Sequence, residues 1–390
     1  MVVLNKTRMG FRIVAAAAIG ATAWNGHVAA LALLPLIVWI WRDSRSRFDA
    51  FLALFAYYLG AGRGLLAGAS VFFTDPFTPP AWWAGVLIWT APSALLAGTW
   101  AAGWGTSRRG LRLLVILAAL ALPPIGIVGW ANPLTAAGAL FPGTGWTGLG
   151  LLLALLVVVA EARRPTLLYP CFVLASVLNV SATAHEEPQW IGLDTRYGPT
   201  DSTEGEFERL RGLQRLVLRA SREAPDGAVF VLPEAVGGAW TVNAAWWQRV
   251  ARKLERKRQT VLVGAKRPDE GSRQYVNILV SLGNETGVEF ASRVPVPIGM
   301  WTPYRDDGAK TAWWETGISV LNGQRAASLV CYEQLLVWPV LVSMAHRPEV
   351  LVGASNDWWA IETNIPDIQR QAVVAWGRLF GVPTVYAANL

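Results

Sequence analysis

Three carboxylates and one thiol stand where short apolar runs end in the second half of this chain. Glu234 follows AVFVLP, Cys331 closes AASLVC two positions before Glu333, and Asp357 comes after VLVGASN. Folds of the α/β class place reactive side chains at strand ends. A thiol beside a carboxylate is typical of a cysteine nucleophile, because the base takes the thiol proton and an acyl thioester forms. These residues therefore predict nucleophilic acyl chemistry.

Each of these residues also has a purely structural explanation. A cysteine in an apolar strand is often a small core residue, a carboxylate after a strand often caps a helix, and Asn356-Asp357 can open a turn. The two cysteines, Cys171 and Cys331, and three scattered histidines lack metal-ligand spacing. The sequence therefore predicts no metal site and no disulfide between the two cysteines.

The runs that end at these residues predict an α/β domain over residues 184–390. Strands are expected at 189–193, 228–232, 260–265, 275–282, 326–331, 350–355 and 384–388, and helices at 205–222, 243–258, 334–345 and 364–380. Nearly continuous apolar strands separated by helices indicate a sheet buried on both faces. This half has no phosphate-loop or dinucleotide motif, so no cofactor is expected; the only G-x-G-x-x-G, at 143–148, lies in an apolar-half loop.

The charge of the chain is divided unevenly between its halves. Residues 1–183 carry 12 Lys/Arg and 4 Asp/Glu, whereas residues 184–390 carry 22 and 23. The sequence pI of about 9.7 therefore comes from the apolar half, in a chain with 53% hydrophobic residues. Because the α/β half has no basic excess, we expect no nucleic-acid contact.

The first half, residues 1–183, is expected to be a multi-pass membrane domain. Seven apolar segments lie at 11–24, 28–41, 50–72, 81–104, 112–130, 149–160 and 167–183, although several are shorter than the roughly 20 residues that a span needs. Arginines or lysines follow every second segment, and the intervening loops have none. The positive-inside rule then predicts a cytoplasmic N-terminus and a periplasmic α/β domain at the inner membrane. Arg63, within the third segment, is expected to meet either a lipid phosphate or a helix-packing partner.

Six short motifs, in this order, resemble the carbon–nitrogen hydrolase (nitrilase) superfamily. They are VLPEA around Glu234, YVNILVSLG at 275–283, VPVPIG at 294–299, SLVCYE around Cys331, ASNDWW at 354–359 and YAAN at 386–389. The C-Y-E and V-P-x-G elements, after a helical membrane half, are similar to the apolipoprotein N-acyltransferase branch. Within that branch the sequence looks most like the conjugal transfer TraB proteins.

This resemblance implies an αββα sandwich with a Glu–Lys–Cys triad. By position, Glu234 is the general base, Cys331 the nucleophile that takes the acyl group, and Glu333 a supporting carboxylate. The similar acyltransferases move a phospholipid acyl chain to a lipoprotein amine. The resemblance therefore implies contact with membrane phospholipid, and with lipoprotein or pilus and conjugation proteins as partners.

The sequence departs from the family pattern at the lysine. The family's lysine position holds Ser292, and the glutamate expected after V-P-x-G is Met300. Arg293 is the first candidate to replace the oxyanion cation and Lys266 the second, although arginine and lysine are not interchangeable. The chain also ends at AANL, where family members usually continue, so an uncovered sheet edge is expected.

Two functions remain open on these residues. One is a membrane-bound acyltransferase or amidase that uses a Cys331 thioester; a general nitrile or amide hydrolase is a weaker variant. The other is a non-catalytic membrane component of a conjugative transfer apparatus that has lost the triad lysine.

Overall fold

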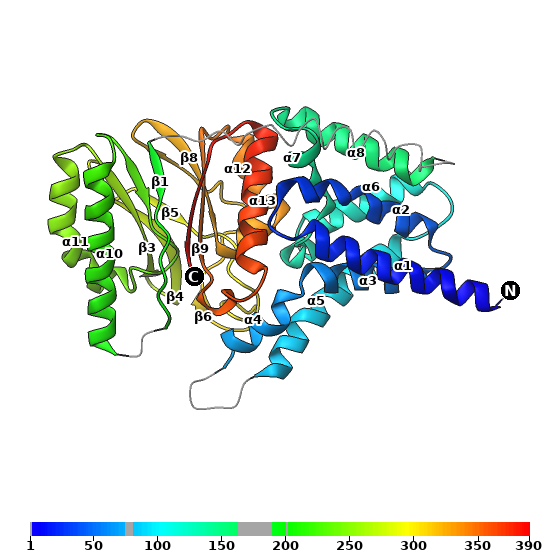
Figure 1. Ribbon diagram of the computed structural model, residues 1–390. Helices are drawn as coiled ribbons and strands as arrows, with labels where there is room; N and C mark the ends of the chain where they lie inside the picture. Colours follow the sequence, from blue (N-terminus) through cyan, green and yellow to red (C-terminus); the bar gives the residue numbers. More distant parts are fainter. Residues whose placement is uncertain (1, 75–80, 163–188, 200–201) are drawn as a thin grey trace. The chain divides into compact units, whose positions relative to one another are not determined.

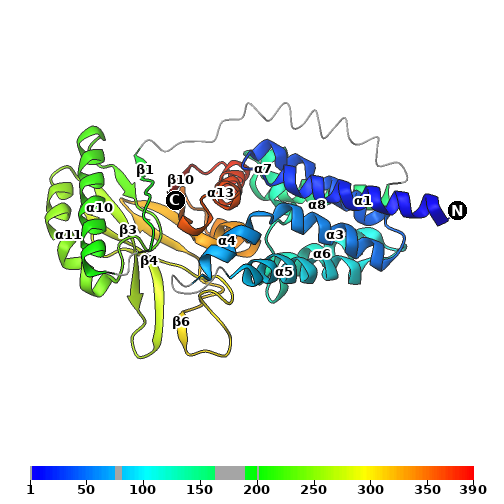
Figure 2. The ribbon, with the colours of Figure 1, turned by 60° about the horizontal axis from the view of Figure 1, so that its bottom comes forward.

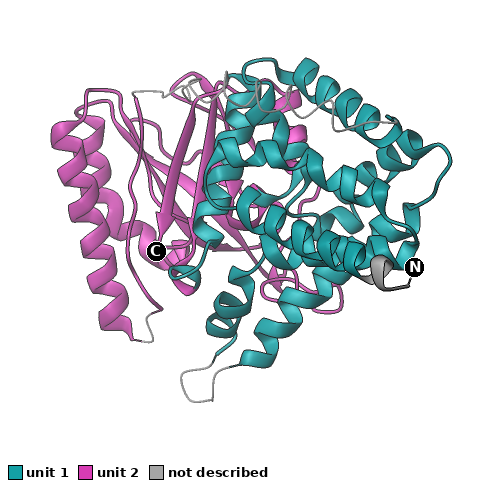
Figure 3. Ribbon diagram, turned by 45° about the vertical axis from the view of Figure 1, so that its right-hand side comes forward, with its two compact units in different colours: residues 1–184, 335–338, 360–381 teal, residues 185–334, 339–359, 382–390 magenta. Residues whose placement is uncertain are grey.

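The computed structural model describes residues 2–74, 81–162, 189–199 and 202–390, with side chains from residue 7 onward (Figure 1). The apolar segment expected at 167–183, with Cys171, lies outside the described residues. The chain divides into two compact units (Figure 3). Unit 1 comprises residues 1–184, 335–338 and 360–381, and unit 2 comprises residues 185–334, 339–359 and 382–390.

The described elements of unit 1 are all helical. The α-helices are α1 (Val2–Ala23), α2 (Pro35–Asp43), α3 (Arg47–Ala61), α4 (Gly64–Phe72), α5 (Trp82–Gly103), α6 (Arg109–Ala121), α7 (Ala137–Leu140), α8 (Gly145–Glu161) and α13 (Ile365–Phe380), and the 3-10 helices are η1 (Val28–Leu33), η2 (Ile125–Val128) and η3 (Pro133–Ala136). Helix α6 ends at Ala121, before the end of the apolar segment expected at 112–130, because Pro123-Pro124 follow.

These helices do not establish seven full crossings. Among the described residues, α5 alone is long and apolar enough to span a membrane, and α3 with α4 forms a second span only if the two are counted together across a 59° bend. The expected segment at 28–41 is split into η1 and the nine-residue α2. The structure therefore shows a helical N-terminal region with one or two candidate spans.

Arg63 stands at the break between α3 and α4 and is used for packing. Its Nη1 donates to the carbonyl oxygens of Ala21, Trp24 and Gly60 at 3.0, 3.2 and 3.2 Å. The backbone carbonyls at the end of α1 are thereby satisfied. Of the two expectations for Arg63, this contact matches the helix-packing one.

The helix expected at 364–380 is confirmed as α13, but it packs with the N-terminal helices of unit 1. Gln371 Nε2 donates to the carbonyls of Ala23 and His27 at 2.8 and 2.7 Å. Asn364 Nδ2 likewise reaches the carbonyls of Trp24 and Ala61. These amides, more than 300 residues away in sequence, satisfy carbonyls that helix ends leave free.

Unit 2 contains two sheets, and every strand expected from the sequence is confirmed. The first sheet has β1 (Trp190–Gly192), β2 (Val229–Val231), β3 (Thr260–Pro268), β4 (Arg273–Gly283) and β5 (Glu289–Ala291) in that order, with β6 (Asp307–Ala309) beside β4; the second has β10 (Thr384–Asn389), β9 (Val350–Asn356), β8 (Gln324–Val330) and β7 (Ile318–Leu321). The short strands β5, β6 and β7 were not expected. In each sheet three strands run parallel: β1, β2 and β3, and β8, β9 and β10.

Side-chain alternation along the strands builds the layers of unit 2. On β2, Val229 and Val231 join a core that also contains Val330, Val350 and Val385 of the second sheet, so the two sheets pack face to face. Phe230 points the other way, into a core with residues of α10 (Thr203–Glu223) and α11 (Trp240–Glu255). Figures 1 and 2 both show α10 and α11 side by side on the outside of the first sheet.

The α-β-β order of these layers confirms a nitrilase-like α/β domain. Because the carboxyl ends of the parallel strands carry the polar residues singled out above, the two sheets place them in one site.

Candidate active site

Glu234 lies just beyond the carboxyl end of β2, where Gly264 of β3 allows a close approach of the two backbones. A Cβ on Gly264 would lie 1.9 Å from the Pro233 oxygen and 2.9 Å from the Glu234 Cα, so only glycine lets β3 come this close. The carboxyl is buried, and Asn277 Nδ2 donates to its Oε1 at 2.5 Å. Glu234 is thereby fixed in position by β3 and β4.

Cys331 follows β8 and begins a 3-10 helix, Cys331–Leu335. Its φ is +52°, a left-handed conformation that is uncommon for a side chain with a Cβ. Such strain is concentrated at functional sites, where the surrounding structure maintains it. The thiol is free and buried, and it hydrogen-bonds to the Glu234 side chain and to the backbone of Asn356. The structure thus brings together the two residues that the sequence singled out.

The electrostatics of this pair follow from burial. Burial raises the pKa of Glu234 to about 7, although hydrogen bonds from Cys331 and Asn277 and the charge of Lys266 oppose the rise. Burial and the charges of Glu234 and Asp357 raise the pKa of the Cys331 thiol well above its usual value. At neutral pH the resting site therefore holds a neutral thiol beside a carboxyl that is close to half ionised.

Asp357, at the end of β9, adds a second buried carboxyl. Its pKa is raised to about 7, chiefly by burial and also by the Glu234 charge, against a hydrogen bond from Ser355. Ser355 Oγ donates to its Oδ2 at 2.5 Å. Two carboxyls that repel each other in one desolvated site favour states in which one of them is protonated.

Lys266 lies at the exposed end of β3, beside Glu234. It pairs in register with Asn277 of β4, which is the residue that bonds Glu234, and its charge lowers the pKa of Glu234. Its Nζ lies 5.1 Å from the ring centroid of Tyr275, and its backbone N–H donates to the Gly238 oxygen at 2.8 Å. Although exposed, Lys266 is a cation whose charge acts on Glu234.

Arg293, the first candidate from the sequence, faces a different carboxylate. Its Nε and Nη2 donate to Glu333 Oε2 at 3.0 and 2.7 Å, and both side chains are almost fully buried. Its remaining donors bind the carbonyls of Ser328 and Pro339, and the Ser343 hydroxyl. With all its donors used, this guanidinium presents none to the Glu234–Cys331 pair, and the role of Arg293 as the oxyanion cation stays a prediction.

Glu333 serves the chain segment rather than the thiol. Besides Arg293, its Oε1 accepts from the Ser292 hydroxyl and the Val294 N–H, both at 3.2 Å, and from the Arg293 N–H. It therefore holds residues 292–294 in place. Ser292, at the family's lysine position, is one of its donors and leaves that position without a charge.

Asn277 is a site residue that the sequence reasoning missed. It lies within YVNILVSLG, and its position opposite Lys266 follows from the antiparallel register of β3 and β4. The only signal in the sequence was a polar residue within an apolar strand.

A hollow of about 340 Å³ adjoins the pair in unit 2. Its walls include Lys266, Asn356 and Trp358, together with Ala235, the residue after Glu234.

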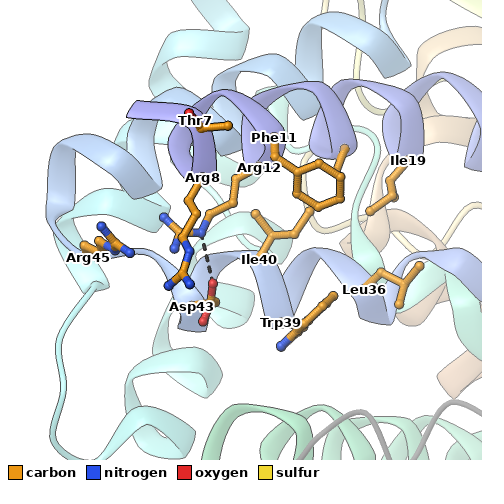
Figure 4. A pocket seen from close by; sticks show the side chains of 11 residues that line it. Thr7, Arg8, Phe11, Arg12, Ile19, Leu36, Trp39, Ile40, Asp43 and Arg45 are labelled. Atoms are coloured by element: carbon orange, nitrogen blue, oxygen red, sulfur yellow. Dashed lines mark hydrogen bonds and ion pairs between the residues drawn. The ribbon is translucent and has the colours of Figure 1, made fainter. Parts of the chain in front are cut away.

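A larger hollow, of about 790 Å³, lies in unit 1 between α1 and α2 (Figure 4). Arg8, Arg12 and Arg45 gather at one end, where Arg12 Nε donates to Asp43 at 3.0 Å. Apolar side chains line the rest, and these include Phe11 and Trp39. With a basic end and an apolar length, this hollow has the chemistry to bind an anionic amphiphile, but it contains no nucleophile–base pair.

Comparisons with known proteins agree with the fold and the order of the motifs. The carbon–nitrogen hydrolase family model matches residues 117–378. The chain is 36% identical to the conjugal transfer protein TraB of Agrobacterium fabrum (strain C58), over 99% of this chain and 94% of that protein. It is 33% identical to a probable conjugal transfer protein TraB of Sinorhizobium fredii (strain NBRC 101917 / NGR234), over 96% and 97%.

Solved structures of an amidase from Nesterenkonia sp. are also similar. One matches at a TM-score of 0.35 and 14% identity, over 51% of this chain and 74% of that chain. Another, with acetamide added at its cysteine, matches at 0.32 and 14%, over 43% and 63%, which is somewhat under two thirds of that chain. Both likenesses are too slight to support an inference about activity.

Proposed function

Because the chain belongs to the carbon–nitrogen hydrolase family and has conjugal transfer relatives, we propose that it is a membrane-bound enzyme that takes an acyl group onto Cys331. One observation carries the proposal: the buried Cys331 thiol hydrogen-bonds to Glu234, whose pKa of about 7 is matched to a general base at neutral pH. In this proposal Glu234 is the base, Cys331 the nucleophile and Lys266 the oxyanion cation.

The chemistry proceeds in two balanced steps. Glu234 takes the thiol proton while the sulfur attacks the acyl carbonyl, and Lys266 stabilises the negative oxygen. The leaving alcohol or amine receives the proton from Glu234, and a thioester remains on Cys331. An incoming amine or water then gives a proton to Glu234, attacks the thioester, and releases the product as the C–S bond breaks. An amine as the acceptor makes the chain an acyltransferase; water as the acceptor, when an amine has left, makes it an amidase.

The membrane setting is part of the same proposal. Residues 1–183 act as a multi-pass anchor in the inner membrane, with a cytoplasmic N-terminus, and residues 184–390 form the hydrolase-like domain in the periplasm. The charge alternation of the loops and the spanning length of α5 support this setting. Membrane phospholipid is the proposed acyl donor, and a lipoprotein or conjugation protein is the proposed acceptor.

Intact-protein mass spectrometry tests the activity directly. The purified full-length protein is incubated in detergent with phosphatidylethanolamine, and an acyl adduct is expected on Cys331. Cys331→Ala should abolish the adduct, and Glu234→Gln should slow its formation by about 10²–10⁴-fold. Glu289→Gln is a matched control, because this carboxylate pairs with Arg267 at 3.2 Å on the same sheet. Full adduct formation in Glu234→Gln would refute the role of the base.

A specific observation also favours the alternative, a non-catalytic component of a conjugative transfer apparatus. Ser292 leaves the family's lysine position uncharged, and the thiol is not activated at rest because its pKa is raised. The alternative predicts that Cys331→Ala and Glu234→Gln leave conjugal transfer frequency unchanged, whereas deletion of the gene lowers it. The proposed enzyme predicts that both substitutions lower transfer as deletion does.

A further inference from the structure

Arg209 lines the same hollow as Lys266, the proposed oxyanion cation. The 340 Å³ hollow that has Lys266 and Asn356 on its walls is also lined by Arg209, Tyr197 and Glu206. Arg209 belongs to α10, and its side chain is only 15% exposed. A cation is thus built into the wall of a hollow that also presents Asn356, whose backbone hydrogen-bonds to the Cys331 thiol.

Within the described part of unit 2, the guanidinium of Arg209 has one long ion pair and an unpaired Nε. Its Nε is buried and has no hydrogen-bond partner there. The ion pair with Glu206 is 3.8 Å long, too far for a hydrogen bond, and the Glu206 side chain is half exposed. A buried donor left unpaired costs about 1–3 kcal/mol, so such a group points to a ligand that completes it.

The surroundings of Arg209 add positive charge. A second hollow shares Tyr197, Gly198, Pro199 and Arg209 with the first, and it is further lined by Arg196, Arg211 and Arg215, against Glu208 alone. Those three arginines are exposed, and Arg211 stacks over Phe207 at 5.5 Å. Arg211 and Arg215 belong to a solvated face of α10 and Arg196 to the exposed chain before that helix, so all three are ordinary surface charges, whereas the buried Nε of Arg209 is not.

We propose that the hollow binds an anionic group of the acyl substrate, a carboxylate or a phosphate, through Arg209. This inference rests on the proposed function, because it assigns the substrate class to the same site. A planar guanidinium binds either anion with paired hydrogen bonds. The anion then lies on the Arg209 wall, and the acyl carbonyl faces Lys266 and the thiol.

Two alkylating reagents of the same size test this proposal without a known substrate. Iodoacetate is anionic and iodoacetamide is neutral; with either, the Cys331 sulfur displaces iodide, the C–S bond forms as C–I breaks, and Glu234 takes the thiol proton. The rate at Cys331 is measured by peptide mass spectrometry and divided by the rate with N-acetylcysteine. Arg209→Gln should lower the iodoacetate rate roughly three- to tenfold, the effect of one partly desolvated charge, and leave the iodoacetamide rate unchanged.

Matched variants separate this effect from misfolding. Arg219→Gln removes an exposed arginine of the same helix that lines neither hollow, and it should change neither rate. Arg209→Lys keeps the charge and should retain most of the iodoacetate rate. The unchanged iodoacetamide rate reports an intact thiol site in each variant.

Added anions identify the group that is bound. Glycerol phosphate and acetate are compared as protectants of Cys331. In the unaltered protein the better one is expected to slow alkylation by iodoacetate but not alkylation by iodoacetamide. In Arg209→Gln it should slow neither reaction. The anion site is overturned if Arg209→Gln leaves the ratio of the iodoacetate rate to the iodoacetamide rate unchanged, or if neither anion protects. Either result leaves the proposed function standing. If neither reagent labels Cys331 in the folded protein, the proposed nucleophile is inert and both proposals fail.

Discussion

Lys266→Met tests which of the two candidate cations, Lys266 or Arg293, stabilises the oxyanion. Methionine keeps most of the apolar stem, and the backbone bond from residue 266 to Gly238 does not depend on the side chain. The contact with Tyr275 is exposed and worth about 0.5–1 kcal/mol. The variant should therefore fold with nearly unchanged stability, and any loss of activity reports on the site.

The expected loss has two parts. Removing the oxyanion cation should lower the acylation rate by about 10²–10³-fold, or about 2.7–4 kcal/mol of transition-state free energy. Lys266 also lowers the pKa of Glu234, which stands at about 7. Acylation by the unaltered protein should therefore rise with pH around 7, as Glu234 ionises, and the rise should move to higher pH in Lys266→Met.

Release of nitrophenolate from a nitrophenyl acyl ester measures the first acylation turnover between pH 5.5 and 9. Lys310→Met is the control, because Lys310 lies beside β6 of the same sheet and pairs with Asp269 at 2.8 Å, away from the thiol. An unchanged rate and pH profile in Lys266→Met would falsify the role of Lys266. Arg293 could not then take the role without releasing Glu333.

Three further outcomes follow from the same contacts. Glu333→Gln should lower the free energy of unfolding in urea by about 3–5 kcal/mol, because it leaves the buried Arg293 charge unpaired; a loss below 1 kcal/mol would contradict the ion-pair role. Burial raises the folded pKa of Glu234 to about 7, so the folded state binds more protons than the unfolded one, and stability is lost as pH rises from about 4.5 through 7. Glu234→Gln should therefore stabilise the protein by up to about 3 kcal/mol at pH 8 and by little at pH 4. Melting temperatures of the two proteins that do not diverge as pH rises would count against the raised pKa. Gly264→Ala should cost about 1–3 kcal/mol and lower Cys331 alkylation, because its Cβ would lie 1.9 Å from the Pro233 oxygen; alkylation at the unaltered rate would show that Glu234 need not be held there.

The strands and the ends of the strands could be predicted from the sequence. Continuous apolar runs specify buried strands, and parallel strands bring their carboxyl ends to one edge. This is why Glu234, Cys331 and Asp357 could each be expected at a strand end, and the packing of the two sheets then brings them together. The strands β5, β6 and β7 could not, since three- and four-residue strands have too little pattern to stand out.

The apolar N-terminal half was predictable in composition but not in geometry. Apolar runs at 28–41 and 112–130 look continuous, yet the first is divided into η1 and α2, and the second ends as a helix at Ala121. Hydropathy reports transfer into an apolar medium, and it does not report where proline or packing ends a helix. The seven crossings therefore stay a prediction.

By itself the sequence determined a buried α/β domain with a thiol and a carboxylate at strand ends, because these depend on local period and strand direction. Only the tertiary structure decided where the two candidate cations lie. Arg293 is one residue from the family's lysine position, but folding places its side chain against Glu333. Lys266 is 26 positions before that slot, but the register of β3 and β4 sets it opposite the Asn277 that bonds Glu234. Partners in a buried site are chosen by packing and by the cost of an unpaired charge, and neither depends on distance along the chain.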